Sequence, residues 1–355
     1  MRVINGRETS MRKSMKQGII AAIAAVGLST TAMAADTLTL AGLGGKVQED
    51  LTNTLFKPAA EKVGVELRGE SHDGLAAVRV QVQSGAPGWD VAHLGAEDCA
   101  IGAAEGLFEP IDYSVVNADG IPERARGKDW VGTNTYSVVL AWRTDKYGDN
   151  PPKDWKDFWN VEKFPGRRAM SVYPQEMMEI SLLGDGVPRD QVYPLDTKRS
   201  LAAIAKIKPN ISVWWSSGAQ SAQLLKDGEV DMEAIWGSRI AGVIADGAPV
   251  KFTYQDGVIG FGCVAILKGT KHLAEAQKLV ANIVSPEIQA RIPTMMGYYG
   301  PANQKAFEVG KFPPEVLAQS NQSPENAAKQ VIMQPTWWAE HMQDVQEDFK
   351  NLITQ

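Results

Sequence analysis

The sequence contains little of what metal or hydrolytic chemistry requires. Its 355 residues include two cysteines and four histidines. The histidines have no metal-like spacing to one another or to a cysteine, and they are His72, His93, His272 and His341. The sequence also lacks a G-x-S-x-G motif, a Walker loop and any convincing grouping of Ser, His and Asp. We therefore expect no bound metal, no cofactor and no catalytic centre of these kinds.

Long apolar runs are absent too. The apolar stretch 18–28 follows a basic stretch that begins at Met11, and small residues follow at 32–34. The length of the apolar stretch 18–28 is about half the roughly 20 residues that a membrane span needs. This pattern is typical of a secretory signal peptide with cleavage near Ala34, and it leaves both Met1 and Met11 open as the start.

The sequence also lacks an excess of basic side chains. Removal of residues 1–34 leaves 31 basic and 41 acidic side chains, a formal charge of −10. This charge disfavours nucleic acid and anionic membrane surfaces as partners. The remaining length exceeds the roughly 250–300 residues that one hydrophobic core holds, so we expect two domains. Together these features predict a soluble, monomeric periplasmic protein.

The two cysteines, Cys99 and Cys263, leave two alternatives open. In an oxidising compartment they could form a disulfide. They could equally be two separate buried thiols, because both stand beside apolar residues. Negative charge on Glu97 and Asp98 disfavours a thiolate at Cys99, so a nucleophilic role for it is not expected.

Hydrophobic periodicity predicts an α/β fold. The first unit reads as strand 37–41, helix 47–63, strand 65–68, helix 75–83 and strand 89–94. This order predicts a parallel, doubly wound sheet that binds ligands beyond the carboxyl ends of its strands. The loops 42–46 and 95–98 therefore matter most.

A second α/β unit follows, beyond a strand at 136–142 that leaves the first unit. Its elements are strand 168–173, helix 175–183, helix 219–226, strand 230–236, helix 240–246 and strand 250–254. The apolar stretch 258–267 could cross back to the first domain. Helices are then expected at 273–284 and 337–353.

The glycine loop after the first strand nearly matches the dinucleotide fingerprint G-x-G-x-x-G. Val47 stands where the third glycine, which allows close packing of helix and strand, belongs. The loop is therefore either a ligand loop, in which Gly44 and Gly45 offer backbone amides at a helix start, or merely a tight turn.

Aromatic residues are numerous near the predicted ligand edge. Ten tryptophans include Trp215 and Trp236, and the latter ends a predicted strand. Tyr298 and Tyr299 occupy a glycine-flanked loop. Such rings can hold an alkylammonium group by cation–π attraction, although most tryptophans in proteins are core residues.

Charged candidates of both signs lie near the same edge. The carboxylates Glu97, Glu176 and Asp256 could each pair with a ligand ammonium, or could be solvated surface acids. The helix start at Ser217 suits an anion, and Arg239 could hold a carboxylate or form a structural salt bridge.

Three segments carry a resemblance to a known family: GGKVQEDLTNTLFKPAAEKVG, SSGAQSAQLLKDGEVDMEAIWGSRI, and MMGYYGPANQKAF with a terminal WWAEHMQDVQEDF. With these segments the chain resembles the periplasmic solute-binding proteins of ABC importers, in the branch of spermidine/putrescine and 4-aminobutyrate binders. The resemblance implies a type II fold with two α/β lobes, a hinge, delivery of the solute to a membrane permease, and no catalysis. The lobes would comprise 35–139 with 262–322, and 140–261 with 323–355.

The resemblance also implies roles for individual residues. Trp236 matches a stacking tryptophan of the polyamine binders, and Glu176 matches an ammonium-binding carboxylate. Tyr298 or Tyr299 matches an aromatic contact, and Glu97 lies on a cleft loop. One departure is that Gly262 stands where those binders place a central acid.

Arg239 and the helix start at 217–220 are similar instead to the 4-aminobutyrate binders and suit a ligand carboxylate. We therefore predict an ABC-importer protein for an amine or polyamine, with a carboxylate-bearing amine or another small carboxylate as the alternative. A rival of another class is a thiamine-cleaving enzyme of the same architecture, with Cys99 or Cys263 as the nucleophile. Sensing rather than transport is a third interpretation.

Overall fold

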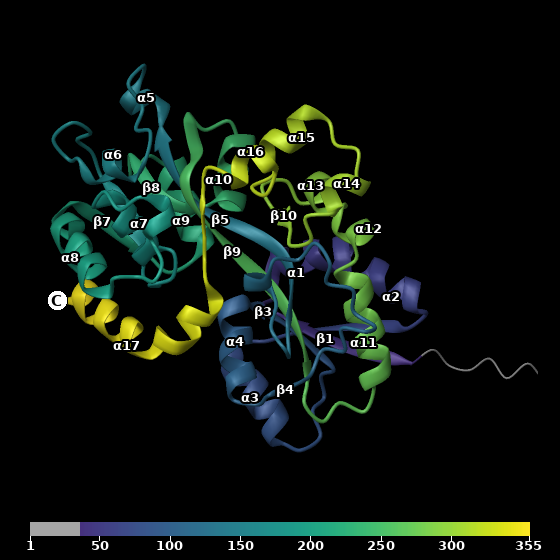
Figure 1. The fold of residues 1–355 in the computed structure, drawn as a ribbon. Coiled ribbons are helices and arrows are strands. Elements are labelled where there is room, and N and C mark those ends of the chain that lie inside the picture. Colours follow the sequence, from purple (N-terminus) through teal and green to yellow (C-terminus); the bar gives the residue numbers. More distant parts are fainter. Residues whose placement is uncertain (1–35) are drawn as a thin grey trace, which may run out of the picture. The chain divides into compact units, whose positions relative to one another are not determined.

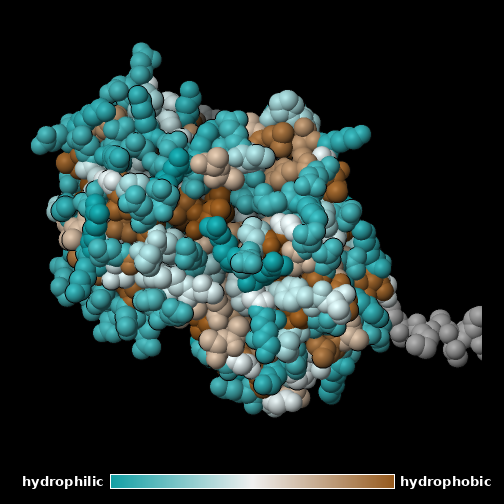
Figure 2. Space-filling model, viewed as in Figure 1, coloured by the Kyte–Doolittle hydropathy of each residue, from teal (hydrophilic) through white to brown (hydrophobic). Residues whose placement is uncertain are grey.

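Alternation of strand and helix patterns produces a mixed α/β structure in residues 36–355, the part of the chain that the computed structural model describes (Figure 1). The predicted signal peptide lies outside the described residues. No helix within them is long and apolar enough to cross a membrane. Figure 2 shows hydrophilic residues over most of the viewed face, with small hydrophobic areas between them.

Strands and helices follow one another along this part of the chain. The strands are β1 (Thr37–Gly42), β2 (Glu66–Ser71), β3 (Val91–Gly95), β4 (Phe108–Glu109), β5 (Val131–Arg143), β6 (Arg168–Ser171), β7 (Ile211–Trp215), β8 (Met232–Trp236), β9 (Val250–Leu267), β10 (Gly300–Pro301) and β11 (Val331–Ile332). The helices are α1 (Gly45–Leu51), α2 (Lys57–Val63), α3 (Leu75–Gln83), α4 (Ala96–Ala104), α5 (Thr144–Tyr147), α6 (Trp155–Trp159), α7 (Met177–Gly184), α8 (Thr197–Ile207), α9 (Gly218–Lys226), α10 (Gly237–Ala245), α11 (Leu273–Ile283), α12 (Pro286–Gln289), α13 (Ile292–Met295), α14 (Ala306–Val309), α15 (Pro314–Gln319), α16 (Pro324–Ala327) and α17 (Pro335–Thr354). Short π and 3-10 turns are η1 (Thr52–Phe56), η2 (Glu123–Ala125), η3 (Arg189–Gln191) and η4 (Lys208–Asn210).

The main strands form one sheet in the order β2-β1-β3-β9-β5-β8-β6-β7. The pairs at each end, such as β1 with β2 and β6 with β7, are parallel, as the strand–helix–strand order predicts. The two central strands run antiparallel to each other and to their outer neighbours. The α/β class is therefore confirmed.

The central strands β5 and β9 are the longest, with 13 and 18 residues. They lie side by side through the middle of the structure (Figure 1). Their register shifts between Gly132 and Asn134 and again between Val138 and Leu140. The prediction of separate strands at 250–254 and 258–267 is wrong, because β9 runs unbroken from Val250 to Leu267 and pairs with β5 on both sides of an irregular stretch at 254–257.

Buried apolar residues form separate cores around this sheet. One core includes Leu38 and Val264 with the helices near the amino-terminal strands. Two other cores cover the opposite faces of the part of the sheet that contains β5, β6 and β8. One of them includes Leu140, and the other includes Val139. Strand β5 thus contributes alternate side chains to both faces, as the period-two geometry of strands requires.

Two further expectations about local structure are resolved. The helix predicted at 47–63 is interrupted by the π-helical turn η1 between α1 and α2. Cys99 and Cys263 form a disulfide between α4 and β9, so the paired alternative is confirmed. Both cysteines are fully buried.

Candidate functional site

A tyrosine on the central strand begins the candidate site. Tyr136 lies opposite Gly260 across the β5–β9 ladder. A Cβ atom at Gly260 would lie 2.4 Å from Cζ of Tyr136, so the tyrosine ring occupies the space that a side chain there would need. Its hydroxyl donates a hydrogen bond of 2.9 Å to Oε1 of Glu176.

Glu176 stands immediately before α7 and is 5 % exposed. Its backbone φ of 62° lies in the left-handed region, which is costly for a residue with a side chain. Such strain persists only where the surroundings enforce it, and it is frequent at ligand sites. In this protein the strained turn points the Glu176 carboxylate at the hydroxyl of Tyr136.

A second carboxylate, Glu97, approaches from the first turn of α4. Its carboxylate folds over Gly95, where a Cβ atom would lie 2.5 Å from Oε1 of Glu97. The residue is 9 % exposed, and its Oε2 has no hydrogen-bond partner among residues 36–355. Burial, together with the nearby Asp98 carboxylate, raises the pKa of Glu97 to about 7.

These acids influence one another electrostatically. Burial, followed by the charges of Glu97 and Glu179, raises the pKa of Glu176 well above its ordinary value. Burial and the charge of Glu176 likewise raise the pKa of the Tyr136 hydroxyl. Within residues 36–355 neither Glu97 nor Glu176 has a salt bridge, although a buried carboxylate ionises readily only beside a cation. The arrangement can therefore hold a positively charged group.

A neutral histidine lies close to this cluster. His93 is buried, its Nε2 lies 3.3 Å from Oδ1 of Asn134, and burial lowers its pKa to about 4. Both side chains pack against Gly262, where a Cβ atom would lie 2.4 Å from Oδ1 of Asn134 and 2.8 Å from Nε2 of His93. The space beside Gly262 is therefore filled by uncharged polar groups.

An indole ring lies on the strand that neighbours that of Tyr136. Trp236 ends β8 opposite Val138, two residues along β5 from Tyr136. Diagonal neighbours of this kind have Cα atoms about 7–8 Å apart. The ring of Trp236 is half-buried and packs edge-on against Trp215, at 4.9 Å between centroids. Trp215 itself is fully buried, and its Nε1 donates to the carbonyl of Ala234, so it supports Trp236 from within the core.

A cationic side chain from α10 packs against the start of α9. Arg239, in the first turn of α10, packs against Gly218, where a Cβ atom would lie 2.4 Å from Nε of Arg239. Ser217 caps α9 by accepting from the amide of Gln220. Arg239 has no salt bridge within the described residues. A guanidinium beside a helix start suits a carboxylate ligand.

The two tyrosines contact the start of α10. The hydroxyl of Tyr299 lies 3.2 Å from Oγ of Ser238. Tyr298, which also has a positive φ of 72°, approaches Gly237 with its Cβ atom. The loop 298–299 and the turn that carries Trp236 and Arg239 are therefore neighbours.

Other candidate residues lie apart from these contacts. Gly44 donates its amide to Gln48, and with Gly45 it lines an open hollow of about 450 Å³. Asp256 forms a salt bridge of 3.2 Å with Arg189. A hollow of about 630 Å³ is lined by Arg189 and Tyr193 among others, and none of the predicted ligand residues lines it.

Sequence analysis singled out neither Tyr136 nor His93 as a candidate site residue. No local motif marks either residue. The one available signal is the glycine pair Gly260 and Gly262 within an apolar strand, because such glycines often mark close approach of another group.

Comparison with known proteins shows the family of the chain. The family model for bacterial extracellular solute-binding proteins matches residues 54–325. A gamma-aminobutyric acid-binding protein of Pseudomonas aeruginosa is 28 % identical over 352 residues, which are 96 % of this chain and 98 % of that protein.

Solved structures show the same architecture. An ABC transporter substrate-binding protein from Bradyrhizobium japonicum USDA 110 is 40 % identical with a TM-score of 0.86, over 90 % of this chain and all of that chain. The PBP MotA from A. tumefaciens B6, in complex with glucopine, is 36 % identical with a TM-score of 0.80, over 89 % and 99 %. The predicted two-lobed periplasmic-binding fold is therefore confirmed.

Proposed function

The chain belongs to the bacterial extracellular solute-binding proteins, and we propose that its solute carries both an ammonium group and a carboxylate. The protein is the solute-binding component of an ABC transporter for a small nitrogenous solute. Between the two ligand classes that the sequence favours, the carboxylate-bearing amine fits the site better than a polyamine. The observation that carries this choice is the placement of buried acids and a free guanidinium at separate helix starts.

The ammonium end of the solute lies at Glu97 and Glu176. Both carboxylates are buried and lack a basic partner among residues 36–355, so a cationic ligand supplies the charge that favours their ionised form. Trp236 offers a ring face to the same cation. The neutral imidazole of His93 adds no repulsion.

The carboxylate end lies at Arg239 and the amides at the start of α9. A polyamine would place a second cation against this guanidinium, which costs affinity because like charges repel. Gly262 offers no acid to offset that repulsion. The relative from Pseudomonas aeruginosa is described as binding gamma-aminobutyric acid, a molecule with both groups.

Capture proceeds by closure of the two lobes over the solute, because a ligand that contacts both lobes favours the closed state by its differential affinity. The predicted lobe boundaries remain part of this proposal, as does a monomeric state. The closed complex then delivers its cargo to the permease. Secretion and cleavage near Ala34 bring the protein to the periplasm, where the Cys99–Cys263 disulfide is stable.

The proposal includes no catalysis. A thiamine-cleaving mechanism requires a cysteine thiolate as nucleophile. Both cysteines of this chain are consumed in one buried disulfide, so neither sulfur can attack a substrate. This observation disfavours the enzymatic alternative independently of the family.

Titration calorimetry of the ligand-free protein tests the choice of solute. Three probes isolate the two charged ends: 4-aminobutyrate has both, putrescine has two ammonium groups, and butyrate has a carboxylate alone. We expect 4-aminobutyrate to bind at least about 100-fold more tightly than either of the others, since an unpaired buried charge costs several kcal/mol.

Variants at each end complete the test. Arg239→Gln should weaken 4-aminobutyrate binding and leave putrescine binding unchanged or improved. Tighter binding of putrescine than of 4-aminobutyrate by the unaltered protein would overturn the proposed solute class and favour a polyamine.

A further inference from the structure

We propose that the Cys99–Cys263 disulfide is a positioning device for solute binding: it holds the first turn of α4 against β9 so that Glu97 stays inside the site. This inference rests on the proposed role of Glu97 in binding an ammonium group. The disulfide would then contribute to the affinity for the solute separately from its contribution to folding stability.

The disulfide lies directly beside the Glu97 carboxylate. Cys99 follows Glu97 by two residues in the same helical turn, and Cys263 follows Gly262 on β9. Gly95 and Gly262 are partners in the β3–β9 ladder. Two links therefore join the turn between β3 and α4 to β9. The first is the backbone pairing of Gly95 with Gly262, and the second is the disulfide, whose Cα atoms are 6.7 Å apart.

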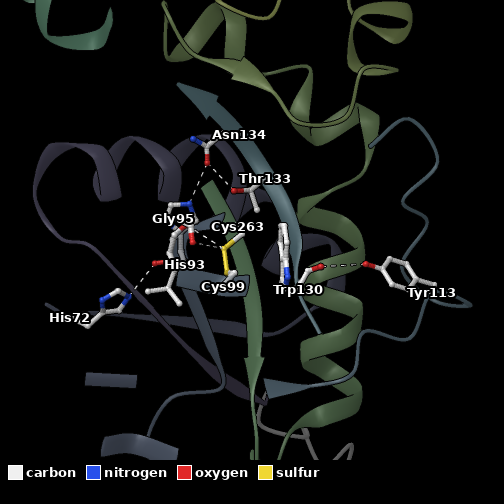
Figure 3. The surroundings of a disulfide bond; sticks show 10 residues. His72, His93, Gly95, Cys99, Tyr113, Trp130, Thr133, Asn134 and Cys263 are labelled. Carbon is white, nitrogen blue, oxygen red and sulfur yellow. Dashed lines mark hydrogen bonds between the residues drawn. A yellow bond between two sulfur atoms is a disulfide. The ribbon is translucent and has the colours of Figure 1, made fainter. Parts of the chain in front are cut away.

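The surroundings of the disulfide are closely packed. Sγ of Cys263 lies 3.5 Å from the carbonyl oxygen of Leu94 and 3.3 Å from that of Gly95. Figure 3 shows the disulfide beside His93, Asn134 and Thr133. A movement of the α4 start away from β9 would have to break this packing as well as the bond.

Without the bond, the first turn of α4 would be held only by packing and by the pairing of β3 with β9. The helix has nine residues, and Gly95 at its N-cap provides no side-chain hydrogen bond. Uncapped ends of short helices fray readily. The turn also carries the buried acid Glu97 next to Asp98, and each would gain hydration by moving outward.

The bond is suited to a permanent tie rather than to a switch. Both sulfur-bearing residues are fully buried, so a reductant cannot reach them in the folded protein. The two cysteines are 164 residues apart in sequence, and a cross-link over so long a loop stabilises the fold in general. Loss of stability after its removal therefore cannot distinguish positioning from ordinary cross-linking.

A double-mutant cycle makes that distinction. The four proteins are the unaltered chain, C99A/C263A, E97Q and the triple variant, each titrated with 4-aminobutyrate at about 15 °C by calorimetry. We expect E97Q to lose about 30-fold or more in affinity. We expect C99A/C263A to lose about tenfold while Glu97 is present, and to lose nothing further in the E97Q background.

The pH profile of affinity provides a second readout. In the unaltered protein, affinity should fall as pH falls below about 7, the pKa of the buried Glu97 carboxyl. In C99A/C263A a hydrated Glu97 should shift this fall toward its ordinary value of 4.5. A cross-link that served stability alone would leave the inflection unchanged.

The outcomes separate the two hypotheses. Equal losses in the Glu97 and E97Q backgrounds, with an unchanged inflection, would overturn the positioning role while leaving the proposed function intact. An E97Q variant with full affinity would overturn both. Should C99A/C263A fail to fold, C99V/C263A replaces it, because valine restores part of the buried volume at position 99.

Discussion

The hydroxyl of Tyr136 donates a hydrogen bond to Oε1 of Glu176 at 2.9 Å, and so joins the central strand β5 to the turn that begins α7. The two residues are 40 positions apart in sequence. In the proposed function, their contact sets where a cationic group meets the sheet, because it fixes one carboxylate oxygen of Glu176. The expected effects of substitutions follow from this arrangement.

Glu176→Gln should abolish most of the affinity for an ammonium ligand. The amide oxygen can still accept from Tyr136, so the local geometry is retained while the charge is lost. Removal of one partner of a buried charged pair costs about 2–5 kcal/mol, which calorimetry with 4-aminobutyrate would detect. Glu61→Gln, at an exposed position, is the matched control and should bind normally. Unchanged affinity in both variants would contradict the role of Glu176.

Affinity and stability should depend on pH in opposite directions. The pKa of Glu97 is raised from 4.5 to about 7 in the folded protein, so the unfolded chain binds fewer protons between these values. The ligand-free protein should therefore lose stability as pH rises from about 4.5 to 7. An ammonium ligand prefers the ionised carboxylate, so its affinity should rise over about pH 6 to 8.

Calorimetry and thermal unfolding across this range measure both slopes. Glu97→Gln should flatten the stability profile between about pH 4.5 and 7 and the affinity profile between about pH 6 and 8. Profiles that keep their slopes in this variant would show that another group titrates.

Glu233→Leu should stabilise the protein. Glu233 is fully buried on β8, both of its carboxylate oxygens lack a hydrogen-bond partner, and burial raises its pKa well above the ordinary value. An apolar side chain removes that desolvation cost, about 1–3 kcal/mol. The gain should grow as pH rises above 4.5, because only the unfolded wild-type chain then ionises this residue.

Thermal unfolding of Glu233→Leu and Glu233→Gln provides the comparison. The glutamine variant keeps a buried polar group and should gain less. A lower midpoint for the leucine variant would reveal a polar partner of Glu233.

Ligand addition should change the tryptophan fluorescence, and Trp236 should supply most of the change. Its ring is half-buried at the site, whereas Trp337 stacks on His341 at 4.3 Å on α17. Trp236→Phe should therefore remove the signal, and Trp337→Phe should keep it. The reverse result would place the solute elsewhere.

Gly262→Ala should destabilise the protein by about 1–3 kcal/mol, because overpacking forces neighbours to shift. The new methyl group would meet Asn134 and His93 at 2.4 and 2.8 Å. Gly69→Ala, at a position with no atom within 4 Å, is the control and should be nearly neutral. Equal unfolding midpoints for the two variants would show that the Gly262 contacts relax freely.

Periodicity predicted most elements because their apolar faces are regular. The helix expected at 75–83 coincides with α3. The expected break in β9 did not occur: Asp256 adopts a φ of 58° within an irregular stretch, and the strand resumes its pairing with β5 at Val258. Sequence analysis also left 197–207 unassigned, although Asp196 caps α8 and Ile204 and Ile207 lie on its buried face.

The site was partly predictable for a different reason. Glu97 lies just after β3 and Trp236 ends β8, so the rule that ligands bind at strand ends marked both as candidates. Tyr136 lies inside a strand, and its role depends on its register against Gly260 and on the distant turn at Glu176. Register across a sheet is a long-range property that no local pattern contains.

The passage of β5 and β9 through every core limits how the chain can be divided. Val131 of β5 packs in the core near the amino-terminal strands, whereas Leu140 of the same strand packs in another. If the chain were cut within β5, each of these two cores would lose part of its central strand. The two resulting fragments should therefore not fold separately. Circular permutation at the exposed segment 148–150 would keep both strands whole. The same segment is the safer place for a reporter insertion.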